Sequence, residues 1–494
     1  MLFNSIPFLV FFPIVVLFYF ALPHKIRWVW LLAASYYFYM AWNPLYALLI
    51  VASTVITYFS GMLIDRTNRK IIDEKKQAFQ KKIWVALSFA SNLSILFFFK
   101  YFDFAIHNLN AIFSRVGIQM LTPAFDVLLP IGISFYTFQA LSYTMDVYRK
   151  EISAERNFAK YALFVSFFPL LVAGPIERAK NLLKQVHERH YFSYENAKNG
   201  LLLMLWGFFQ KIVIADRLAI IVNYIFFHFD SYSGFHIVIA TLLFAIQIYC
   251  DFSAYSDIAK GAAQVMGFRA TTNFRQPYFA KSIQAFWHRW HISLSTWFRD
   301  YLYIPLGGSR CSKLKKYRNV MITFLVSGLW HGASWNFLIW GGLHGSYQVI
   351  GEITKPRKQK IYDRLKINTD SWLFKLGKIL TTFVLVNISW IFFRAAGGRH
   401  AYDLIRQIFT NFSPYGNPLR GLSTTTGDHY VLAISIIVLL IVDYMRSKYD
   451  VYEKLSSQNI FVRWAVYLII AMSILLFGVF GTDYEQTQFI YFQF

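Results

Sequence analysis

Long apolar runs are the feature that most limits what this chain can fold into. Residues 7–22, 46–64, 430–442 and 466–479 are four such runs, and a helix needs about 20 apolar residues to cross the hydrocarbon core of a bilayer. Only 15% of the residues are charged, whereas soluble domains carry roughly 25%. A large soluble protein with buried core helices is therefore disfavoured. The sequence predicts an all-α, polytopic integral membrane protein.

The spacing of these runs predicts the number of membrane helices. We expect about eleven or twelve spanning or embedded segments, one or two of them re-entrant. One of these spans is expected to be centred near residue 330. We find no internal repeat and no low-complexity linker, so residues 1–494 are predicted to form one membrane domain. The first apolar run lacks a basic flank, which indicates a retained helix rather than a cleaved signal.

Basic residues gather in short loops between the apolar runs. The formal net charge is +23, but loop Lys and Arg near spans mark the cytoplasmic side and meet anionic lipid. The charge is therefore no indication of nucleic-acid binding. Placing the basic loops 66–82, 355–366 and 446–454 in the cytoplasm puts the N-terminus and the tail, residues 481–494, outside it. The two cysteines predict neither a disulfide framework nor a metal site.

Residues 273–318 differ from the rest of the chain. They mix Trp and Phe with Arg, Lys and His at short intervals, which makes the segment too polar to span. Aromatic rings favour the headgroup level and basic groups favour anionic lipid. We therefore expect an interfacial or re-entrant segment.

His331 is the most informative single residue, because it lies in an otherwise apolar stretch, residues 321–345. An ionisable group inside a membrane is costly and is a functional-site hypothesis by default. The alternative is a neutral histidine that hydrogen-bonds between helices. Trp330 and Trp335 flank it. Small residues that allow close approach by another helix or by a substrate surround it: Gly328, Gly332, Ala333 and Ser334.

Two further features are weaker when taken alone. His291 is a second candidate, with a surface anchor as the alternative, and His288 would share its face if this stretch were helical. We expect His344 to be structural or interfacial. The polar island CDFSAYSD, residues 250–257, is interpreted as a helix end with capping groups.

Two long motifs resemble a known family. They are RWHISLSTWFRDYLYIPLGGSR, residues 289–310, and LVSGLWHGASWNFLIWGGLHG, residues 325–345. Both closely resemble the membrane-bound O-acyltransferase family, in the bacterial branch that includes the membrane proteins of alginate O-acetylation and teichoic acid D-alanylation. The residues of the motifs are more similar to the alginate type than to the teichoic acid type. Residues 129–149, 172–178 and 250–268 are also similar to that branch.

The resemblance implies a helical fold around a central tunnel in the bacterial inner membrane. It implies that His331 is the catalytic histidine and that His291 holds a second, less strict position. Trp330, Trp335 and Ser334 would line the tunnel or bind the donor. The implied donor is acyl-coenzyme A, with acetyl as the expected group, and no bound cofactor or metal is expected. The implied partners are membrane lipid, an extracytoplasmic acyltransferase and a polysaccharide as indirect acceptor.

The last residues carry a further resemblance. Phe489, Tyr491 and Phe494 form Phe-x-Tyr-x-x-Phe, which resembles the C-terminal motif of the small partner peptide in teichoic acid D-alanylation systems. It implies that Tyr491 carries the acyl group as a relay, with an aromatic interface anchor as the alternative. Arg289 and Arg299 could attract the donor phosphates, and lipid headgroups are an equally good target for them.

Other classes of protein remain open from the residues alone. A transporter, or a scaffold for a polysaccharide-export complex, fits several spans and an intramembrane histidine equally well. Many transporters show repeat symmetry, which this sequence lacks, so an acyltransferase is favoured.

Overall fold

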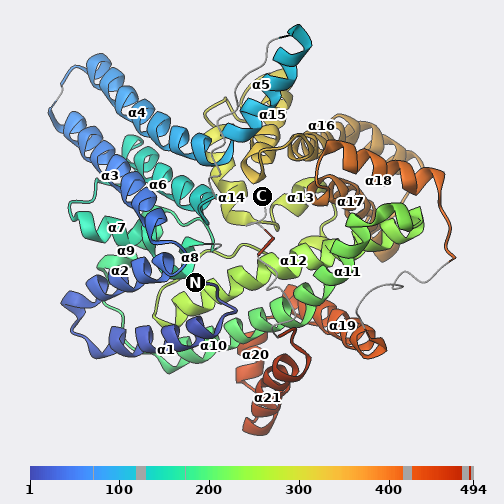
Figure 1. The fold of residues 1–494 in the computed structure, drawn as a ribbon. Helices are drawn as coiled ribbons and strands as arrows, with labels where there is room; N and C mark the ends of the chain where they lie inside the picture. The colour runs from blue at the N-terminus through green and yellow to red at the C-terminus, as the bar shows by residue number, and fades with distance from the viewer. Residues whose placement is uncertain (71, 118–128, 173, 416–424, 481–488, 491–494) are drawn as a thin grey trace. The chain divides into compact units, whose positions relative to one another are not determined.

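The structure is a computed structural model. It describes the whole chain except residues 71, 118–128, 173, 416–424, 481–488 and 491–494. All regular secondary structure in this described part is helical (Figure 1). The chain forms two compact units. The first unit contains Met1–Met204 and Ile258–Thr271, and the second contains Leu205–Asp257 and Thr272–Phe494.

Among the described residues, six helices are long and apolar enough to cross a membrane. They are α3 with the turn before it (Pro44–Lys70), α4 (Glu74–Lys100), α12 (Gly234–Val265), α17 (Trp372–Arg394), α19 (Thr426–Lys448) and α21 (Ile460–Phe477). The prediction of an all-α, multi-pass membrane protein is confirmed. The larger number of spanning or embedded segments stays a prediction.

The apolar helices differ in how much of their surface the protein itself covers. In α12, 72% of the apolar window is buried, whereas in α21 the share is 6%. Leu468, Ile469 and Leu475 on α21 are each more than half exposed. A continuous exposed apolar surface of this kind is costly in water and suits lipid. We therefore assign α12 to the core of the protein and α21 to its lipid-facing surface.

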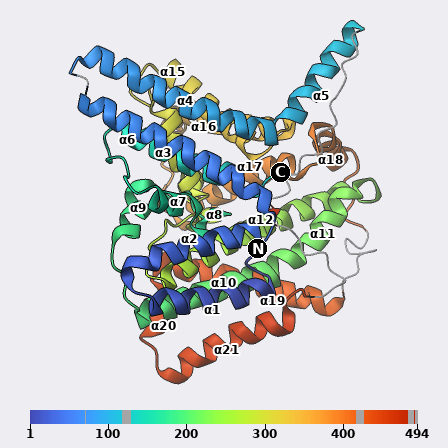
Figure 2. The same cartoon turned by 60° about the vertical axis from the view of Figure 1, so that its left-hand side comes forward.

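The first unit is built from helical hairpins. In Figures 1 and 2, α3 and α4 run side by side. Buried polar side chains join them to each other and to their neighbours: Ser53 donates to Asn92 Oδ1 at 2.6 Å, and Tyr161 donates to Thr57 Oγ1 at 2.8 Å. Such bonds help to hold membrane helices together, because the hydrophobic effect between helices is weak in lipid. The other helices of this unit are α1 (Ile6–Ala21), α2 (His24–Met40), α5 (Phe102–Phe113), α6 (Ile133–Tyr148), α7 (Phe158–Ser166), α8 (Phe168–Leu171), α9 (Ala179–His187) and most of α10 (Tyr194–Phe208).

The turn between α3 and α4 shows how local sequence sets the helix ends. Asp73 accepts hydrogen bonds from the backbone N–H groups of Lys75 and Lys76, at 2.9 and 3.2 Å. An aspartate in this N-cap position satisfies backbone donors that the first helical turn leaves open. The basic residues of segment 66–82 lie in the last turns of α3, which ends at Lys70, and in the first turns of α4, which begins at Glu74.

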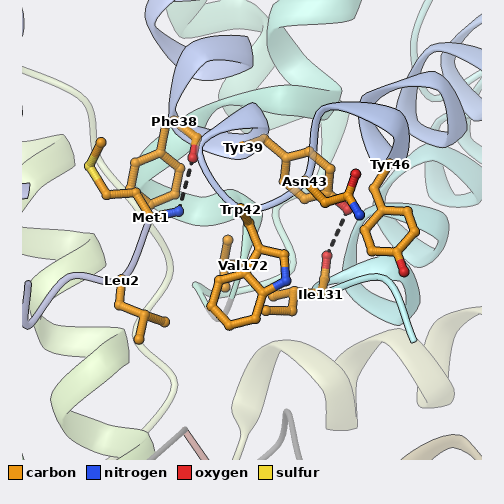
Figure 3. Close-up of a pocket in the computed structure, with 9 residues that line it drawn as sticks. All are labelled: Met1, Leu2, Phe38, Tyr39, Trp42, Asn43, Tyr46, Ile131 and Val172. Atoms are coloured by element: carbon orange, nitrogen blue, oxygen red, sulfur yellow. Dashed lines mark hydrogen bonds between the residues drawn. The ribbon is translucent and has the colours of Figure 1, made fainter. Parts of the chain in front are cut away.

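A small pocket lies in the first unit, where the chain start meets the end of α2 (Figure 3). The Met1 ammonium donates to Phe38 O at 3.1 Å, and the Tyr39 hydroxyl donates to Ile131 O at 2.9 Å. None of the side chains that line it is a carboxylate or an imidazole. The pocket therefore offers no side chain for acid–base chemistry near neutral pH, and the group in it that titrates there is the Met1 amine, whose pKa burial lowers to about 6.

The second unit packs around α12 and a group of large aromatic side chains. Trp290, Trp340 and Trp390 are fully buried. The Trp290 and Trp390 ring centroids lie 5.2 Å apart, within the range in which aromatic pairs attract. Further helices of this unit are the π-helix η3 (Phe209–Ala215), α11 (Asp216–Phe227), α13 (Ile283–Trp287), α14 (Ile292–Phe298), the π-helix η6 (Arg299–Tyr303), α15 (Lys313–His331), α16 (Trp335–Arg364), α18 (Gly398–Thr410) and α20 (Val451–Ser456).

Candidate active site

His331 lies at the turn of a helical hairpin. We expected one span centred near residue 330, but the structure has two helices here, α15 ending at His331 and α16 beginning at Trp335. A Cβ atom added to Gly328 would overlap the carbonyl oxygen of Phe337, and one added to Gly341 would overlap that of Phe324. The glycines therefore let the two backbones touch. The small residues of this segment predicted close approach by either another helix or a substrate. At Gly328 the structure shows approach by a helix.

The hairpin contact gives a matched pair of substitutions on one helix. We expect Gly341→Ala to destabilise the protein by about 1–3 kcal/mol, because the new methyl group must push the two backbones apart. Gly351→Ala should leave stability unchanged or slightly raised, since a Cβ at Gly351 meets nothing within 4 Å and Ala favours helix more than Gly does. Thermal unfolding in detergent measures both. Equal melting temperatures for the two variants would contradict the close backbone packing.

The chain breaks its helical conformation directly after His331. Gly332 and Ser334 both have extended backbone, with φ near −164° and −154°. The ring of Phe337 occupies the place where a side chain on Gly332 would lie. The turn is therefore fixed by packing from α16, and it holds His331 at the end of α15.

The imidazole of His331 is enclosed by aromatic rings. Its side chain is 3% exposed. Its ring centroid lies 4.9 Å from that of Trp340, 5.0 Å from that of Trp330 and 5.4 Å from that of Phe393. Such surroundings have a low dielectric constant, which favours the neutral imidazole. A neutral imidazole can accept a proton, which is what a general base must do.

His291 is held in an unusual backbone conformation. It has φ of 44°, in the left-handed region, which non-glycine residues rarely adopt. Asn273 supports this turn, because its carbonyl oxygen accepts from Ile292 N at 3.0 Å and its Oδ1 accepts from Ser293 N at 3.2 Å. The sequence did not single out Asn273, since its partners become visible only in the folded chain.

The same turn separates His291 from His288. The two would share a face only in one continuous helix, and here α13 ends at Trp287 and α14 begins at Ile292. His288 is exposed and His291 is fully buried. Burial lowers the pKa of His291 to about 3, so its ring is neutral at physiological pH.

The structure brings the two candidate histidines to one aromatic side chain. The Trp330 ring lies 5.0 Å from the ring of His331 and 6.1 Å from that of His291. The three residues come from the end of α15 and the start of α14. Their proximity makes them one candidate site, and the chemical role of each histidine stays a prediction.

The other predicted site residues lie in different surroundings. Trp335 is 55% exposed, and Ser334 is half-buried at the hairpin turn. Arg289 is half-buried and makes a long hydrogen bond of 3.5 Å to Gln276 O. Arg299 is exposed and pairs with Asp300 at 2.8 Å. Their roles in tunnel lining or donor binding therefore stay predictions.

Tyr491 lies outside the described residues, but the two residues before it are described. Phe489 and Ile490 are 0% and 3% exposed. The Phe489 ring lies 5.5 Å from that of Phe252, and the Phe252 ring lies 4.5 Å from that of His291. The Phe252 ring therefore contacts both the described part of the tail and His291.

The polar island at residues 250–257 is not a helix end, so that prediction was wrong. The island lies inside α12, which continues to Val265. Its carboxylates are satisfied by partners from distant parts of the chain instead of by capping: Asp251 pairs with Lys211 at 2.6 Å and Asp257 pairs with Arg446 at 3.4 Å.

His344 has a structural role, as we expected. The Trp287 indole, which can only donate, bonds to His344 Nδ1 at 3.2 Å. The opposite ring nitrogen, Nε2, bonds to Ser389 Oγ at 2.8 Å, and Ser389 donates its own proton to Val386 O at 2.7 Å. His344 is therefore a neutral ring with its proton on Nε2, and both nitrogens are used.

The model of the membrane-bound O-acyltransferase family matches residues 35–364. The chain belongs to this family. It is therefore a membrane-bound acyltransferase, which confirms the resemblance in the motifs and decides against a transporter or a scaffold without chemistry. The matched range of the O-acyltransferase model includes His291 and the whole α15–α16 hairpin, and it ends before Phe489.

Individual relatives agree with the family. A protein of Azotobacter vinelandii described as "Probable alginate O-acetylase AlgI" is 39% identical over 412 residues, which is 83% of this chain and 78% of that protein. The peptidoglycan O-acetyltransferase of Helicobacter pylori is 36% identical over 407 residues, 76% of this chain and 73% of that one. The teichoic acid D-alanyltransferase of Streptococcus thermophilus is 29% identical over 288 residues, 53% of this chain and 68% of that one.

Proposed function

We propose that this O-acyltransferase moves an acetyl group from cytoplasmic acetyl-coenzyme A across the bacterial inner membrane, for O-acetylation of an extracytoplasmic polysaccharide. The names of the alginate and peptidoglycan relatives support the acetyl group and the class of acceptor. The main observation behind the mechanism is the pair of buried histidines whose rings both lie beside the Trp330 ring.

His331 acts as the general base in this proposal. An acceptor hydroxyl oxygen attacks the thioester carbonyl carbon, so that a C–O bond forms and the C–S bond breaks. His331 takes the hydroxyl proton during the attack and returns it to the departing sulfur, so coenzyme A leaves as the thiol. A positioned base of this kind contributes roughly 10²–10⁴ in rate.

His291, whose ring also lies beside Trp330, supports the same step. A neutral imidazole carries one N–H group, which can donate to the carbonyl oxygen as negative charge develops on it. It could equally orient the donor. The aromatic surroundings of both histidines exclude water, which strengthens such electrostatic contacts and limits hydrolysis of the thioester.

Tyr491 is the first acceptor in the proposed sequence. A free tyrosine phenol has a pKa of about 10, so a phenol gives up its proton more easily than a sugar hydroxyl does. The resulting ester keeps a good leaving group, so an extracytoplasmic partner protein can pass the acetyl group to the polysaccharide. The burial of Phe489 and Ile490 near His291 supports this role. Only the acetyl group crosses the membrane.

The orientation follows from charge and belongs to the same proposal. The basic loops face the cytoplasm, where Arg289 and Arg299 attract the phosphates of the donor. The N-terminus and residues 481–494 face the outside. The acetyl group thus enters from the cytoplasmic side, and it reaches the outside as an ester on Tyr491 of the tail.

Label mapping tests the function directly. Purified protein is incubated with coenzyme A thioester that carries the label in the acetyl group, without an acceptor, and its peptides are examined by mass spectrometry. We expect thiol release and a labelled acetyl group on the peptide that contains Tyr491. Label placed in the coenzyme A part should not join the protein. A folded protein that releases no thiol and gains no label would refute the proposal.

A further inference from the structure

A buried ionic cluster in the second unit has no part in the chemistry proposed above. It consists of Lys211 on η3, Asp216 at the start of α11 and Asp251 on α12; we call it the Lys211 cluster. Lys211 Nζ lies 2.6 Å from Asp251 Oδ1 and 2.8 Å from Asp216 Oδ1, and its side chain is 1% exposed. Buried charges are costly unless they are paired, and inside membranes they commonly mark functional positions.

The Lys211 cluster makes one contact with the tail. The Asp216 and Asp251 carboxylates share the ammonium group of Lys211, and Asp251 pairs with it through Oδ1. The other oxygen of Asp251, Oδ2, accepts a hydrogen bond from the backbone N–H of Ile490 at 2.8 Å. A hydrogen bond to an ionised acceptor is roughly twice as strong as one between neutral groups. The contact joins positions 239 residues apart in the chain.

Neighbouring side chains of α12 complete a slot for the tail. Asp251, Phe252 and Tyr255 lie at positions i, i+1 and i+4 of one helix; we call them the tail slot. The Phe489 ring lies 4.4 Å from the Tyr255 ring and 5.5 Å from the Phe252 ring. Lys211 Nζ lies 5.7 Å from the centre of the Tyr255 ring. Side chains of the polar island thus bind the tail at the Phe489 ring and at the Ile490 backbone.

We propose that Asp251 is a positioning residue for acyl transfer, because it fixes the backbone at Ile490 beside the His291 side of the site. Consecutive Cα atoms are about 3.8 Å apart, so an anchored Ile490 limits where the next residue can reach. The Lys211 ammonium group holds the Asp251 carboxylate in place. This inference rests on the proposed function, because the position of Ile490 affects transfer only if the tail accepts the acetyl group.

Two matched variants test the role of Asp251. Asp251→Ala and Asp216→Ala each remove one carboxylate from Lys211, but only the first removes the acceptor of Ile490 N–H. We expect Asp251→Ala to lose hydrogen-exchange protection at residues 489–490 and to lower acetyl loading of the tail by about 10²-fold, because a small displacement of a reacting group is enough for such a loss. Asp216→Ala should retain both. Asp251→Asn keeps an oxygen that can accept from Ile490 and should recover most of the protection and loading.

Hydrogen exchange needs no turnover, so it tests the slot even if the wild-type protein transfers no acetyl group. Equal losses of loading in Asp251→Ala and Asp216→Ala, or unchanged exchange at residues 489–490 in Asp251→Ala, would overturn the proposal. Should Asp251→Ala fail to fold, Phe489→Ala tests the same slot from the tail side. We expect the same local loss of protection and loading in that variant, and wild-type values in it would also overturn the proposal.

Discussion

His331→Ala is expected to abolish acetyl transfer while the protein keeps its fold. The substitution removes the proposed base, which should cost about 10²–10⁴ in rate. Because His331 is the last residue of α15 and alanine is a good helix former, the helix itself should persist. The measurements are the rate of thiol release from acetyl-coenzyme A and the melting temperature of the purified protein in detergent.

His288→Ala is the matched control for this prediction. It removes the same side chain from an exposed position three residues before His291, so transfer and stability should stay at wild-type values. A folded His331→Ala protein that releases thiol at the wild-type rate would refute the assignment of the base. A variant that has lost its melting transition would direct the test to His331→Gln, which keeps more of the side-chain volume.

Tyr491→Phe is expected to stop acetylation of the extracellular product. The substitution removes only the hydroxyl group that would accept the acetyl group, so the aromatic ring of the tail is kept. With no hydroxyl at this position, no ester can form on the side chain. The measurements are the acetyl content of the extracellular polysaccharide in cells that carry the variant and the label on the tail peptide in the purified protein.

Tyr415→Phe provides the control for the loss of a hydroxyl. Tyr415 is 87% exposed, so its change should leave acetylation unaffected. Wild-type acetylation by Tyr491→Phe would reject the relay, and transfer would then pass directly from the donor to another acceptor. The assignment of His331 would survive this outcome, because thiol release in the His331→Ala experiment tests it separately.

The sequence predicted the fold class correctly because membrane insertion depends on local composition. A run of about 20 apolar residues is costly in water wherever it occurs, so a run such as 46–64 predicts a membrane helix without knowledge of the tertiary fold. The long motifs around His291 and His331 gave the family, which the match over residues 35–364 confirmed. An ionisable residue in an apolar stretch marked His331 as a candidate by the same reasoning about cost.

The positions at which helices end near His331 and His291 could not be predicted in this way. The hairpin turn after His331 depends on the Phe337 ring, which fills the space beside Gly332, and on glycines that meet the opposite backbone. The turn at His291 depends on hydrogen bonds that Asn273 accepts from the backbone N–H groups of Ile292 and Ser293. Each of these contacts is made by a residue outside the helix whose end it fixes. The periodicity of that helix therefore could not reveal it.

By itself, the sequence determined that this protein is a helical membrane enzyme of the O-acyltransferase family and that His331 and His291 are its candidate histidines. Only the tertiary structure decided that both rings lie beside Trp330 and that the polar island lies inside α12, where Asp251 binds Lys211 and the backbone of Ile490. The physical reason is that apolar length and composition act locally along the chain. The partner of a buried charge is chosen by packing, and here it lies 239 residues away.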